Sequence, residues 1–511
     1  MSPLRKREAL ALVSGVLLAL SFPKFGHGAV AWIALVPLLI ALPGTTTGEG
    51  ARLGYLTGAV SAVGLLYWTA LVVVQYGGLS LPMGIVIMGL LGLAFAVFPL
   101  VFGAIVSVWL RAFGPAALLV SPFAWVATEL LRAHTFFEFP WCLLGYSQQE
   151  NPAAIQIAAY TAVYGVSFAV MLASALVAYA ALVAERRLVA LAGFVVLLAG
   201  LHGYGAWTMA QPLPEAGTIR VGLVQGGVAQ EDKWRPELAL ENVDRHLELT
   251  RQAEAQGAQL VVWPESAVPF YYDHTPALAE RLREEVRSHG IHLIFGNDDR
   301  EIAPAGEGRV FVGAKMLSPH GDLVLRYHKI QLVPFGEYVP LQPLITLGGR
   351  VAAKVIEQVA DFTPGTEPVV GEALGHRLGV FICYEAVFPH LVRRFAAGGA
   401  ELLVNITNDA WYGRTSAPHQ HLAMTAFRAV ENGRYLVRAA NTGITAVVDP
   451  RGRVVARTSL FEATVLVRDV PLLKGSTFYA RHGDVFAWAA LGATLALTAS
   501  LLASQRRRGK G

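Results

Sequence analysis

The sequence predicts two kinds of structure in one chain: a polytopic α-helical membrane domain with about eight spans, and an α/β domain. Hydrophobic residues make up 54% of the 511 residues and charged residues only 15%, whereas a soluble globular chain carries about a quarter charged residues. Long apolar stretches recur through the first 207 residues, and short apolar strands alternate with polar helices after them. The chain is also too long for one compact core, so at least two domains are expected.

The N-terminal part of the chain contains apolar stretches long enough to approach or cross a hydrocarbon core of about 30 Å. We expect seven helices there, near 9–22, 28–43, 53–75, 82–109, 115–131, 158–183 and 188–207. The first is interpreted as a helix rather than a signal peptide, because no small-residue cleavage site with a polar mature start follows it. An eighth span, Val485 to Ser504, lies near the end of the chain.

Positive residues gather on one side of these predicted spans. They are Arg5, Lys6 and Arg7 before the first span, Arg52, Arg111, Arg186 and Arg187 in alternate loops, and Arg506, Arg507, Arg508 and Lys510 after the last. Cytoplasmic loops of membrane proteins carry an excess of Lys and Arg. We therefore expect both termini in the cytoplasm and the block between the seventh and eighth spans on the outer side of the membrane.

The predicted domains are a transmembrane domain of seven helices over 1–207, an extracytoplasmic domain over 208–482, and a last transmembrane helix with a basic tail over 483–511. Alternation of strands and helices in the middle block is typical of an α/β domain with its strands buried between helical layers. The expected strands are Ile219–Gly226, Leu260–Trp263, His292–Gly296, Val310–Met316, Arg377–Ile382, Leu402–Thr407 and Ile444–Val448. The expected helices include Glu237–Gln256, Pro276–Ser288 and Gln420–Asn432.

Several function classes are disfavoured by composition. The net charge of +4 is too small to indicate nucleic-acid binding, and the two cysteines, Cys142 and Cys383, give neither a disulfide framework nor a metal cluster. The chain contains no CxxC, no HExxH and no glycine-rich phosphate loop of useful specificity. We therefore expect no metal and no cofactor.

One of these cysteines ends an apolar run. Val380, Phe381 and Ile382 predict a short buried strand that ends at Cys383, where a turn begins. A strand that runs into a sharp turn can hold a nucleophilic side chain out of the sheet, with the next backbone N–H pointing back at it. A cysteine in that place needs a base and a positive group to be reactive. The alternative is a small core residue, which is the commoner role of a free cysteine.

Two further motifs supply the groups that such a cysteine needs. A strand runs into Pro264, which cannot continue the ladder, and Glu265 follows it. A carboxylate in an apolar setting is suited to general base catalysis. Lys329 precedes an apolar run, and a fixed ammonium can stabilise an oxyanion. Taken singly, Glu265 and Lys329 would each be a solvated surface charge; together with Cys383 they supply a base, an electrophilic stabiliser and a nucleophile.

These motifs resemble those of the nitrilase superfamily, and in particular its membrane-bound family, the apolipoprotein N-acyltransferases. The matching pieces are WPES at 263–266, HK at 328–329 with LVPFGEYVP after it, CYE at 383–385, VQG at 224–226 with Lys233–Trp234, FPW at 139–141, GYSQ at 145–148 and LVNITNDAWYG at 403–413. The resemblance covers nearly the whole chain. It implies an α-β-β-α sandwich held between seven helices and one helix.

The resemblance also implies a role for each site residue. Glu265 would be the general base, Lys329 the oxyanion stabiliser and Cys383 the nucleophile. The supporting or substrate-binding positions would be Glu337, Tyr384, Glu385 and Trp234. The backbone N–H of Tyr384 would assist Lys329, and the segment from Leu341 to Ala360 would be a flexible arm over the entrance.

The activity that the resemblance implies is acyl transfer in lipoprotein maturation. An acyl chain would pass from a membrane phospholipid, usually phosphatidylethanolamine, through a thioester on Cys383 to the N-terminal amine of the diacylglyceryl-cysteine of apolipoproteins. The enzyme would be a monomer in the bacterial inner membrane, with its catalytic domain in the periplasm. Three rival interpretations remain: a membrane-tethered nitrilase-type hydrolase that uses water as the acceptor, a transporter with a binding module, and an inactive scaffold.

Overall fold

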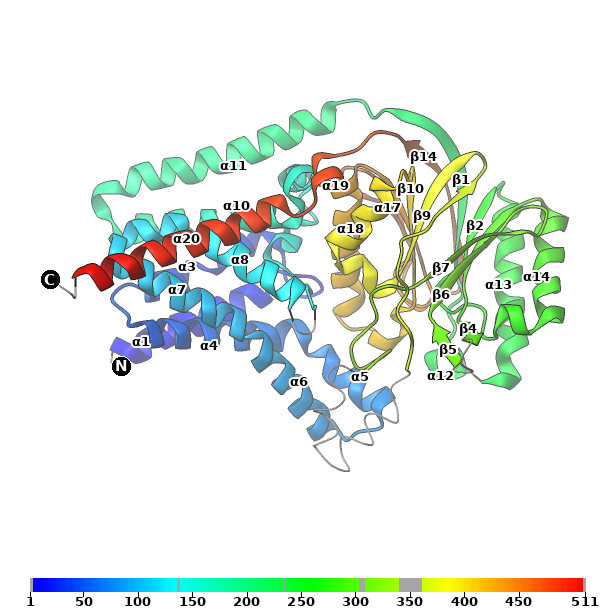
Figure 1. The fold of residues 1–511 in the computed structure, drawn as a ribbon, viewed down its shortest axis with the longest axis horizontal. Helices are drawn as coiled ribbons and strands as arrows, with labels where there is room; N and C mark the ends of the chain where they lie inside the picture. Colours follow the sequence, from blue (N-terminus) through cyan, green and yellow to red (C-terminus); the bar gives the residue numbers. More distant parts are fainter. Residues whose placement is uncertain (1–2, 136–137, 234, 303–307, 340–360, 509–511) are drawn as a thin grey trace. The chain divides into compact units, whose positions relative to one another are not determined.

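The computed structural model describes residues 3–135, 138–233, 235–302, 308–339 and 361–508. The chain divides into two compact units (Figure 1). The first comprises Met1–Gln211, Thr415–Phe427 and His482–Gly511, and the second comprises Pro212–Arg414 and Arg428–Arg481. The divisions at 211 and 481 lie within a few residues of the predicted domain boundaries, whereas the assignment of 415–427 to the first unit was not expected. Trp234 and the segment from Leu341 to Ala360, the predicted arm, lie outside the described residues.

The first unit is helical. Its α-helices are α1 (Pro3–Ala19), α2 (Ala31–Ala34), α3 (Val36–Ala41), α4 (Thr47–Leu66), α5 (Trp68–Gly77), α6 (Leu81–Phe95), α7 (Val97–Phe113), α8 (Ser121–His134), α9 (Pro152–Ile155), α10 (Ala158–Leu182), α11 (Arg187–Ala210) and α20 (Val485–Arg508). Local sequence sets several of their ends. Thr46 and Glu49 form a capping box at the start of α4, and Gly78, with φ of 60°, ends α5 in the left-handed region.

Four helical stretches among the described residues are long and apolar enough to cross a membrane: Leu81–His134, Ala158–Leu182, Ala184–Ala210 and Val485–Ala503. A fifth is obtained if α4 and α5, which are bent by 52° at their junction, form one span. The predicted spans at 82–109 and 115–131 both fall in the first stretch. The predicted span at 9–22 falls on the 17-residue α1, which at 1.5 Å per residue is about 26 Å long and slightly short of the hydrocarbon core. The count of eight spans therefore remains a prediction.

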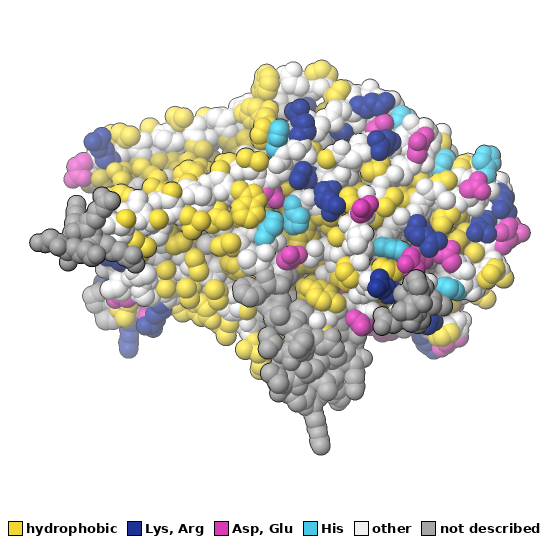
Figure 2. All heavy atoms as spheres, in the orientation of Figure 1, with side chains coloured by type: hydrophobic (Ala, Val, Ile, Leu, Met, Phe, Trp, Pro, Cys, Tyr) yellow, Lys and Arg dark blue, Asp and Glu magenta, His cyan; other side chains and the backbone are white. Residues whose placement is uncertain are grey.

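The surface of the helical unit is apolar, as expected of helices that face lipid. Figure 2 shows hydrophobic side chains along its helices, whereas charged and histidine side chains gather over the strand-rich unit. Leu188 is 82% exposed, Val196 69% and Leu90 61%. Exposed apolar surface of this extent marks a membrane or protein contact rather than a surface in water.

The second unit contains two six-stranded sheets and a small hairpin. The first sheet has the order β14-β1-β2-β3-β6-β7 and the second β13-β12-β11-β10-β9-β8. Strands of the first are β1 (Glu215–Gln225), β2 (Leu260–Val262), β3 (His292–Gly296), β6 (Gly313–Leu317), β7 (Leu323–His328) and β14 (Thr464–Leu473). Strands of the second are β8 (Val370–Ala373), β9 (His376–Ile382), β10 (Leu402–Thr407), β11 (Tyr435–Ala440), β12 (Ala446–Val448) and β13 (Val454–Arg457), and β4 (Asp299–Ile302) pairs with β5 (Gly308–Phe311).

The two sheets pack on each other, with β1 against β11 and β6 against β9. Helices α13 (Ala239–Glu254) and α14 (Pro276–His289) cover the first sheet, with Val243, Leu282 and Val261 in one buried apolar cluster. Helix α17 (Pro389–Ala397) packs on β9. The residues of α18 (Ala417–Asn432) up to Phe427 belong to the first unit and those from Arg428 to the second. Two sheets with helices outside them form the four-layer, nitrilase-like arrangement that the resemblance implies.

The parallel strands bring their carboxyl ends together. In the first sheet β2 is parallel to β1 and β3, and in the second β10 is parallel to β9 and β11. Neighbouring parallel strands end at the same edge of a sheet, where open α/β sheets place their ligands. The residues that follow β2, β3, β9 and β10 are therefore candidates for a common site.

Candidate active site

The three residues predicted to carry the chemistry all follow strands. Glu265 lies three residues after β2, Lys329 directly follows β7, and Cys383 directly follows β9. Cys383 begins a 3₁₀ turn, Cys383–Val387, and has a φ of 49°. A positive φ at a non-glycine residue stores backbone strain, and such strain is concentrated at functional sites.

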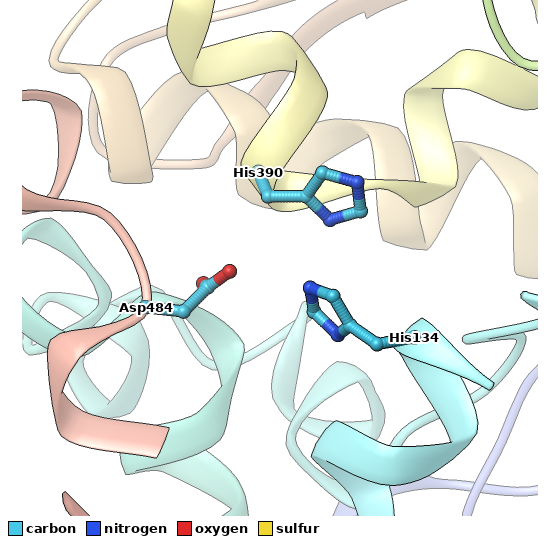
Figure 3. Close-up of side chains that lie close together, drawn as sticks. All are labelled: His134, His390 and Asp484. Atoms are coloured by element: carbon cyan, nitrogen blue, oxygen red, sulfur yellow. The ribbon is translucent and has the colours of Figure 1, made fainter. Parts of the chain in front are cut away.

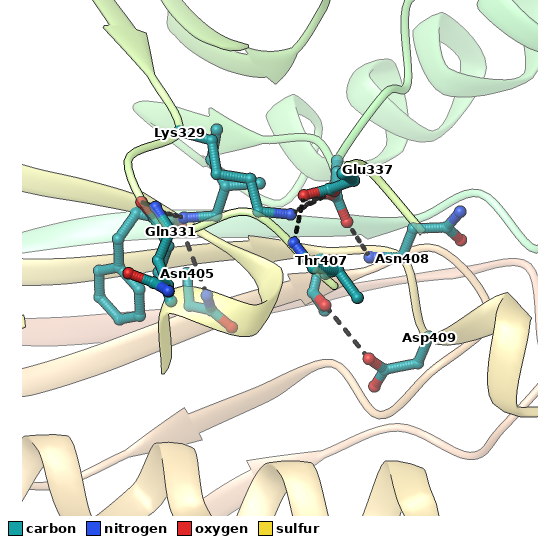
Figure 4. Close-up of polar contacts among 12 residues, drawn as sticks. Lys329, Gln331, Glu337, Asn405, Thr407, Asn408 and Asp409 are labelled. Atoms are coloured by element: carbon teal, nitrogen blue, oxygen red, sulfur yellow. Dashed lines mark hydrogen bonds and ion pairs between the residues drawn. The ribbon is translucent and has the colours of Figure 1, made fainter. Parts of the chain in front are cut away.

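Lys329 joins two carboxylates from different segments. Its side chain is 0% exposed, and Nζ donates to Glu265 Oε1 at 3.2 Å and to Glu337 Oε1 at 2.6 Å. Figure 4 shows the side chains of Lys329 and Glu337 directed toward each other. Burial by itself would lower the pKa of Lys329, but the charges of Glu265 and Glu337 outweigh it, so that pKa lies well above its ordinary value. Lys329 is therefore a fixed ammonium.

Glu265 is held at three atoms. Its Oε2 accepts the backbone N–H of Asn408 at 2.8 Å, while Oε1 accepts from Lys329. Its backbone carbonyl accepts from Nζ of Lys233 at 2.7 Å. A Cβ on Gly296 would come within 2.6 Å of the Cα of Glu265, so close packing of the neighbouring strand fixes this segment as well. The orientation of the carboxylate is thus determined before any substrate binds.

Glu337 and Glu385 have different surroundings, although burial raises the pKa of both. Glu337 Oε2 accepts the N–H of Val333 at 2.9 Å, and its other oxygen bonds Lys329. Glu385 bonds no charged group among these contacts. Its donors are the N–H of Ile382 at 2.7 Å, the N–H of Ile330 at 2.7 Å, the N–H of Gln331 at 3.2 Å and the hydroxyl of Tyr327 at 2.6 Å.

These bonds give Glu385 a structural role in the site. It connects the turn that carries Cys383 to the segment that directly follows Lys329. Removing one partner of such a buried network leaves unsatisfied donors. Glu385 therefore fixes the position of the thiol relative to the ammonium.

Cys383 is buried, with 5% of its surface exposed, and its sulfur is not part of a disulfide. Burial raises its pKa far above the ordinary value, Glu265 raises it further, and Lys329 opposes both. The resting residue is consequently a neutral thiol that requires a base to become nucleophilic. The charges of Glu265 and Lys329 both shift the pKa of this thiol, so the three groups lie in one neighbourhood.

The remaining predicted residues have separate outcomes. Tyr384 is 1% exposed, and its ring packs edge-on against Phe388 at 5.0 Å between centroids. Its backbone N–H directly follows Cys383 in the chain. Trp234 lies outside the described residues, although Lys233 beside it contacts Glu265.

Two buried ionisable groups near the site were given no role by sequence analysis, although Lys233 belongs to one of the matching pieces. Burial lowers the pKa of Lys233 to about 8, against the charges of Glu265 and Asp298. Burial raises the pKa of Asp298 to about 7, helped by the charge of Glu265. Asp298 follows β3, the parallel neighbour of β2, and that position was the only signal that could have indicated it.

Three possible metal ligands, His134, His390 and Asp484, are drawn in Figure 3. His134 and Asp484 belong to the first unit and His390 to the second. Within either unit taken alone, this group supplies fewer than the three protein ligands typical of a catalytic zinc site. We therefore assign no metal centre to it.

Comparisons with known proteins agree on one family. A family model described as carbon-nitrogen hydrolase matches residues 220–476, and one described as apolipoprotein N-acyltransferase N-terminal domain matches residues 14–176. A protein of Geobacter metallireducens named apolipoprotein N-acyltransferase is 40% identical over 504 residues, covering 97% of this chain and 95% of that protein. A protein of the same name from Methylococcus capsulatus is 35% identical, covering 98% and 97%.

Among solved structures, an amidase from Nesterenkonia sp. AN1 is similar to part of the chain. It is 26% identical, with a TM-score of 0.40. The similarity covers 55% of this chain and 99% of the amidase.

Proposed function

Because the chain belongs to the apolipoprotein N-acyltransferase family, whose activity is the N-acylation of lipoproteins, we propose that it takes its acyl chain from a membrane phospholipid and carries it as a thioester on Cys383. The acceptor is the N-terminal amine of the diacylglyceryl-cysteine of an apolipoprotein. The two substrates react in turn, in a ping-pong cycle. By family resemblance the donor is phosphatidylethanolamine, and the working enzyme is a monomer.

The observation that supports this proposal most strongly is the pair of contacts made by Lys329. One buried ammonium bonds two carboxylates, those of Glu265 and Glu337, which are 72 residues apart in the sequence. Cys383 directly follows β9, and the charges of Glu265 and Lys329 act on the pKa of its thiol. A nucleophile, a base and a fixed cation are the groups that acyl transfer through a covalent intermediate requires.

In the first half-reaction Glu265 takes the proton of the Cys383 thiol, and Sγ attacks the ester carbonyl of the phospholipid. The tetrahedral oxyanion is stabilised by the Lys329 ammonium and by the backbone N–H of Tyr384. The ester C–O bond then breaks, and the lyso-phospholipid leaves with the proton held by Glu265. The acyl group remains on Sγ as a thioester.

In the second half-reaction the α-amine of the diacylglyceryl-cysteine attacks the thioester. Glu265 accepts a proton from the attacking nitrogen, the C–S bond breaks, and the proton passes to Sγ. The products are the amide and the free thiol. Lys329 is the same oxyanion stabiliser in both halves, because its high pKa keeps it charged throughout.

A membrane-bound site makes energetic sense for this reaction. Transfer of an acyl chain of about 15 carbons from lipid to water would cost roughly 12 kcal/mol, at ~0.8 kcal/mol per CH₂.

We propose eight spans with both termini in the cytoplasm and the catalytic unit in the periplasm. The test is labelling of intact cells by a membrane-impermeant thiol reagent: a cysteine introduced at the exposed Lys474 should react and one introduced at Arg506 should not.

The decisive experiment is the intact mass of the protein purified from bacterial membranes. We expect an acyl adduct on Cys383 that is absent from C383A, retained in C142S, and lost with formation of N-acylated product when a diacylglyceryl peptide is added. Release of free fatty acid without N-acylated peptide would favour the nitrilase-type hydrolase. No adduct under any donor condition would favour an inactive scaffold.

A further inference from the structure

The end of β10 lies beside the nucleophile. β9 and β10 are parallel neighbours in which Ile382 is paired with Ile406. The next residue on each chain is Cys383 and Thr407. Neighbouring strands of a sheet lie about 4.8 Å apart, so the residues at the ends of β9 and β10 are close in space. Thr407 is 0% exposed and Cys383 5%, so no bulk water separates the two strand ends.

Thr407 belongs to a buried chain of polar contacts. Its Oγ1 donates to Asp409 Oδ1 at 3.1 Å, and Asp409 Oδ2 accepts from the Arg438 guanidinium at 2.7 Å. Figure 4 shows Thr407 and Asp409 directed toward each other at the end of β10. Arg438 also donates to Asn405 Oδ1. Each of these four side chains is at most 1% exposed, so their bonds act in a medium of low dielectric.

The packing around Asp409 leaves it little freedom. A Cβ on Gly443 would come within 2.5 Å of Asp409 Oδ2, so the backbone there lies directly against the carboxylate. Asn405 adds a second attachment, because its Nδ2 donates to the carbonyl of Phe381 on β9 at 3.3 Å. The network therefore spans β9, β10 and β11, and it holds the strand that ends in the nucleophile.

We propose that Thr407 is a further residue of the catalytic site, whose hydroxyl is the hydrogen-bond partner of Cys383 Sγ, and that Asp409 and Arg438 are positioning residues for that hydroxyl. The inference rests on the proposed function, because it takes Cys383 as the nucleophile. Nothing in the motifs that carry the family resemblance assigns this task to Thr407.

The single hydroxyl proton of Thr407 has two acceptors available. In the resting enzyme it is directed to Asp409 Oδ1. When Glu265 removes the thiol proton, Sγ keeps the electron pair, and the Thr407 hydroxyl rotates to donate to it. Asp409 stays ionised beside Arg438. The same bond receives Sγ when the C–S bond breaks in the second half-reaction, until Glu265 returns the proton.

The charges around Cys383 explain why such a donor matters. Burial, Glu265 and Asp409 all raise the pKa of the thiol, whereas Lys329 and a hydrogen bond from Thr407 lower it. The charge of Cys383 also acts on the pKa of Lys233 and of Tyr412, so these two groups lie near the thiol. Few groups here favour the thiolate, so losing one of them should be measurable.

The test is to compare Thr407→Val, which keeps the shape of the side chain and removes the hydroxyl, with Thr407→Ser, which keeps the hydroxyl. A hydrogen bond to a charged group predicts that T407V slows acyl-enzyme formation about 10- to 100-fold. It also predicts that iodoacetamide alkylates Cys383 about tenfold more slowly at a fixed pH of about 7, as expected for one pKa unit of lost thiolate stabilisation. T407S should stay within about threefold of the wild type, and Thr218→Val, at an exposed position of β1, should change neither measurement.

Each outcome decides one question. Wild-type rates of acyl-enzyme formation and of alkylation in T407V would overturn the inference, and the proposed function would stand as long as the wild type still forms its acyl adduct. An absent adduct on wild-type Cys383 would overturn the proposed function itself. If T407V does not elute as a folded protein, the same two measurements on Thr407→Ala, which removes the hydroxyl without adding bulk, support or overturn the inference in its place.

Discussion

Two buried lysines bond different atoms of Glu265, and their pKa values shift in opposite directions. Lys329 bonds the carboxylate of Glu265 and that of Glu337, whereas Lys233 bonds the backbone carbonyl of Glu265. The two side chains are 0% and 3% exposed. Yet the pKa of Lys329 lies well above its ordinary value, and that of Lys233 falls to about 8.

The difference shows that direct ion pairs, and not depth, decide the charge of a lysine here. Burial lowers the pKa of both amines. Two carboxylates in hydrogen-bond contact reverse that effect at Lys329, while a neutral carbonyl does not reverse it at Lys233. The carboxylate of Glu265 therefore bonds Lys329, which stays charged. The backbone carbonyl of Glu265 bonds Lys233, whose pKa of about 8 is close to physiological pH.

The largest effect should follow from removing the permanent cation. In Lys329→Met the tetrahedral oxyanion loses its charged partner, and two buried carboxylates lose theirs. Single oxyanion donors are worth about 10²- to 10³-fold in rate, so we expect acyl-enzyme formation to fall by at least about 10³-fold. The measurement is the rate of appearance of the adduct mass on Cys383.

Lys329→Arg is the matched control, because it keeps the charge but needs more room in a fully buried site. It should recover part of the activity at most. If K329M, eluting as a folded protein, formed the adduct within about tenfold of the wild-type rate, Lys329 would not be the oxyanion stabiliser.

A smaller and pH-dependent effect should follow from removing the titrating cation. Lys233 is charged below pH 8 and neutral above it, so the wild-type rate of acyl-enzyme formation should decline as pH rises through about 8. In Lys233→Met that decline should disappear. The rate at pH 7 should be about tenfold lower than that of the wild type, the effect expected from the loss of one hydrogen bond. The assay omits the acceptor peptide, because its α-amine also titrates near pH 8.

Lys474→Met serves as the control for that experiment, because the side chain of Lys474 is 67% exposed. It should leave the pH profile unchanged. A decline near pH 8 that persists in K233M would assign it to another group.

The contrast between the two lysines also separates what sequence can predict from what it cannot. Glu265, Lys329 and Cys383 each follow or precede an apolar run, so the sequence marks them as ends of buried strands. The structure places Glu265 and Cys383 just beyond two predicted strands, β2 and β9, and joins Glu265 to Lys329. Lys329 follows β7, a strand that was not predicted, and the apolar run after Lys329 is not a strand. Their chemical roles remain predictions.

Other parts of the site depend on register and tertiary packing, which leave no local signal. Thr407 lies beside Cys383 only because β9 and β10 pair as they do. Arg438 lies in a strand, β11, that the sequence analysis did not predict. The predicted strand Val310–Met316 is in fact two strands, β5 and β6, which meet at Val312 and belong to different sheets.

The smallest expected effect comes from Asp298, a buried carboxyl near Lys233 whose ionised form destabilises the fold. Its Oδ1 is buried without a hydrogen-bond partner in the described part of the chain, and its pKa is raised to about 7 by burial and by Glu265. A carboxyl whose folded pKa exceeds its unfolded value binds more protons when folded, so its contribution to stability falls as pH rises between the two values. Asp298→Asn removes that cost, which reaches up to about 4 kcal/mol for three pKa units.

The stabilisation by D298N should therefore grow from pH 5 to pH 7 and then level off, while acyl-enzyme formation changes by less than about threefold, within the range of a lost weak contact. Thermal unfolding of the detergent-solubilised protein at pH 5 and pH 8 measures it. Asp469→Asn is the control, because that carboxylate is 60% exposed and should give no pH-dependent gain. A gain of equal size at both pH values would mean that Asp298 is already ionised at pH 5. Lys233 would then be acting as a full ion-pair partner, and the two lysines would differ less than their contacts with Glu265 imply.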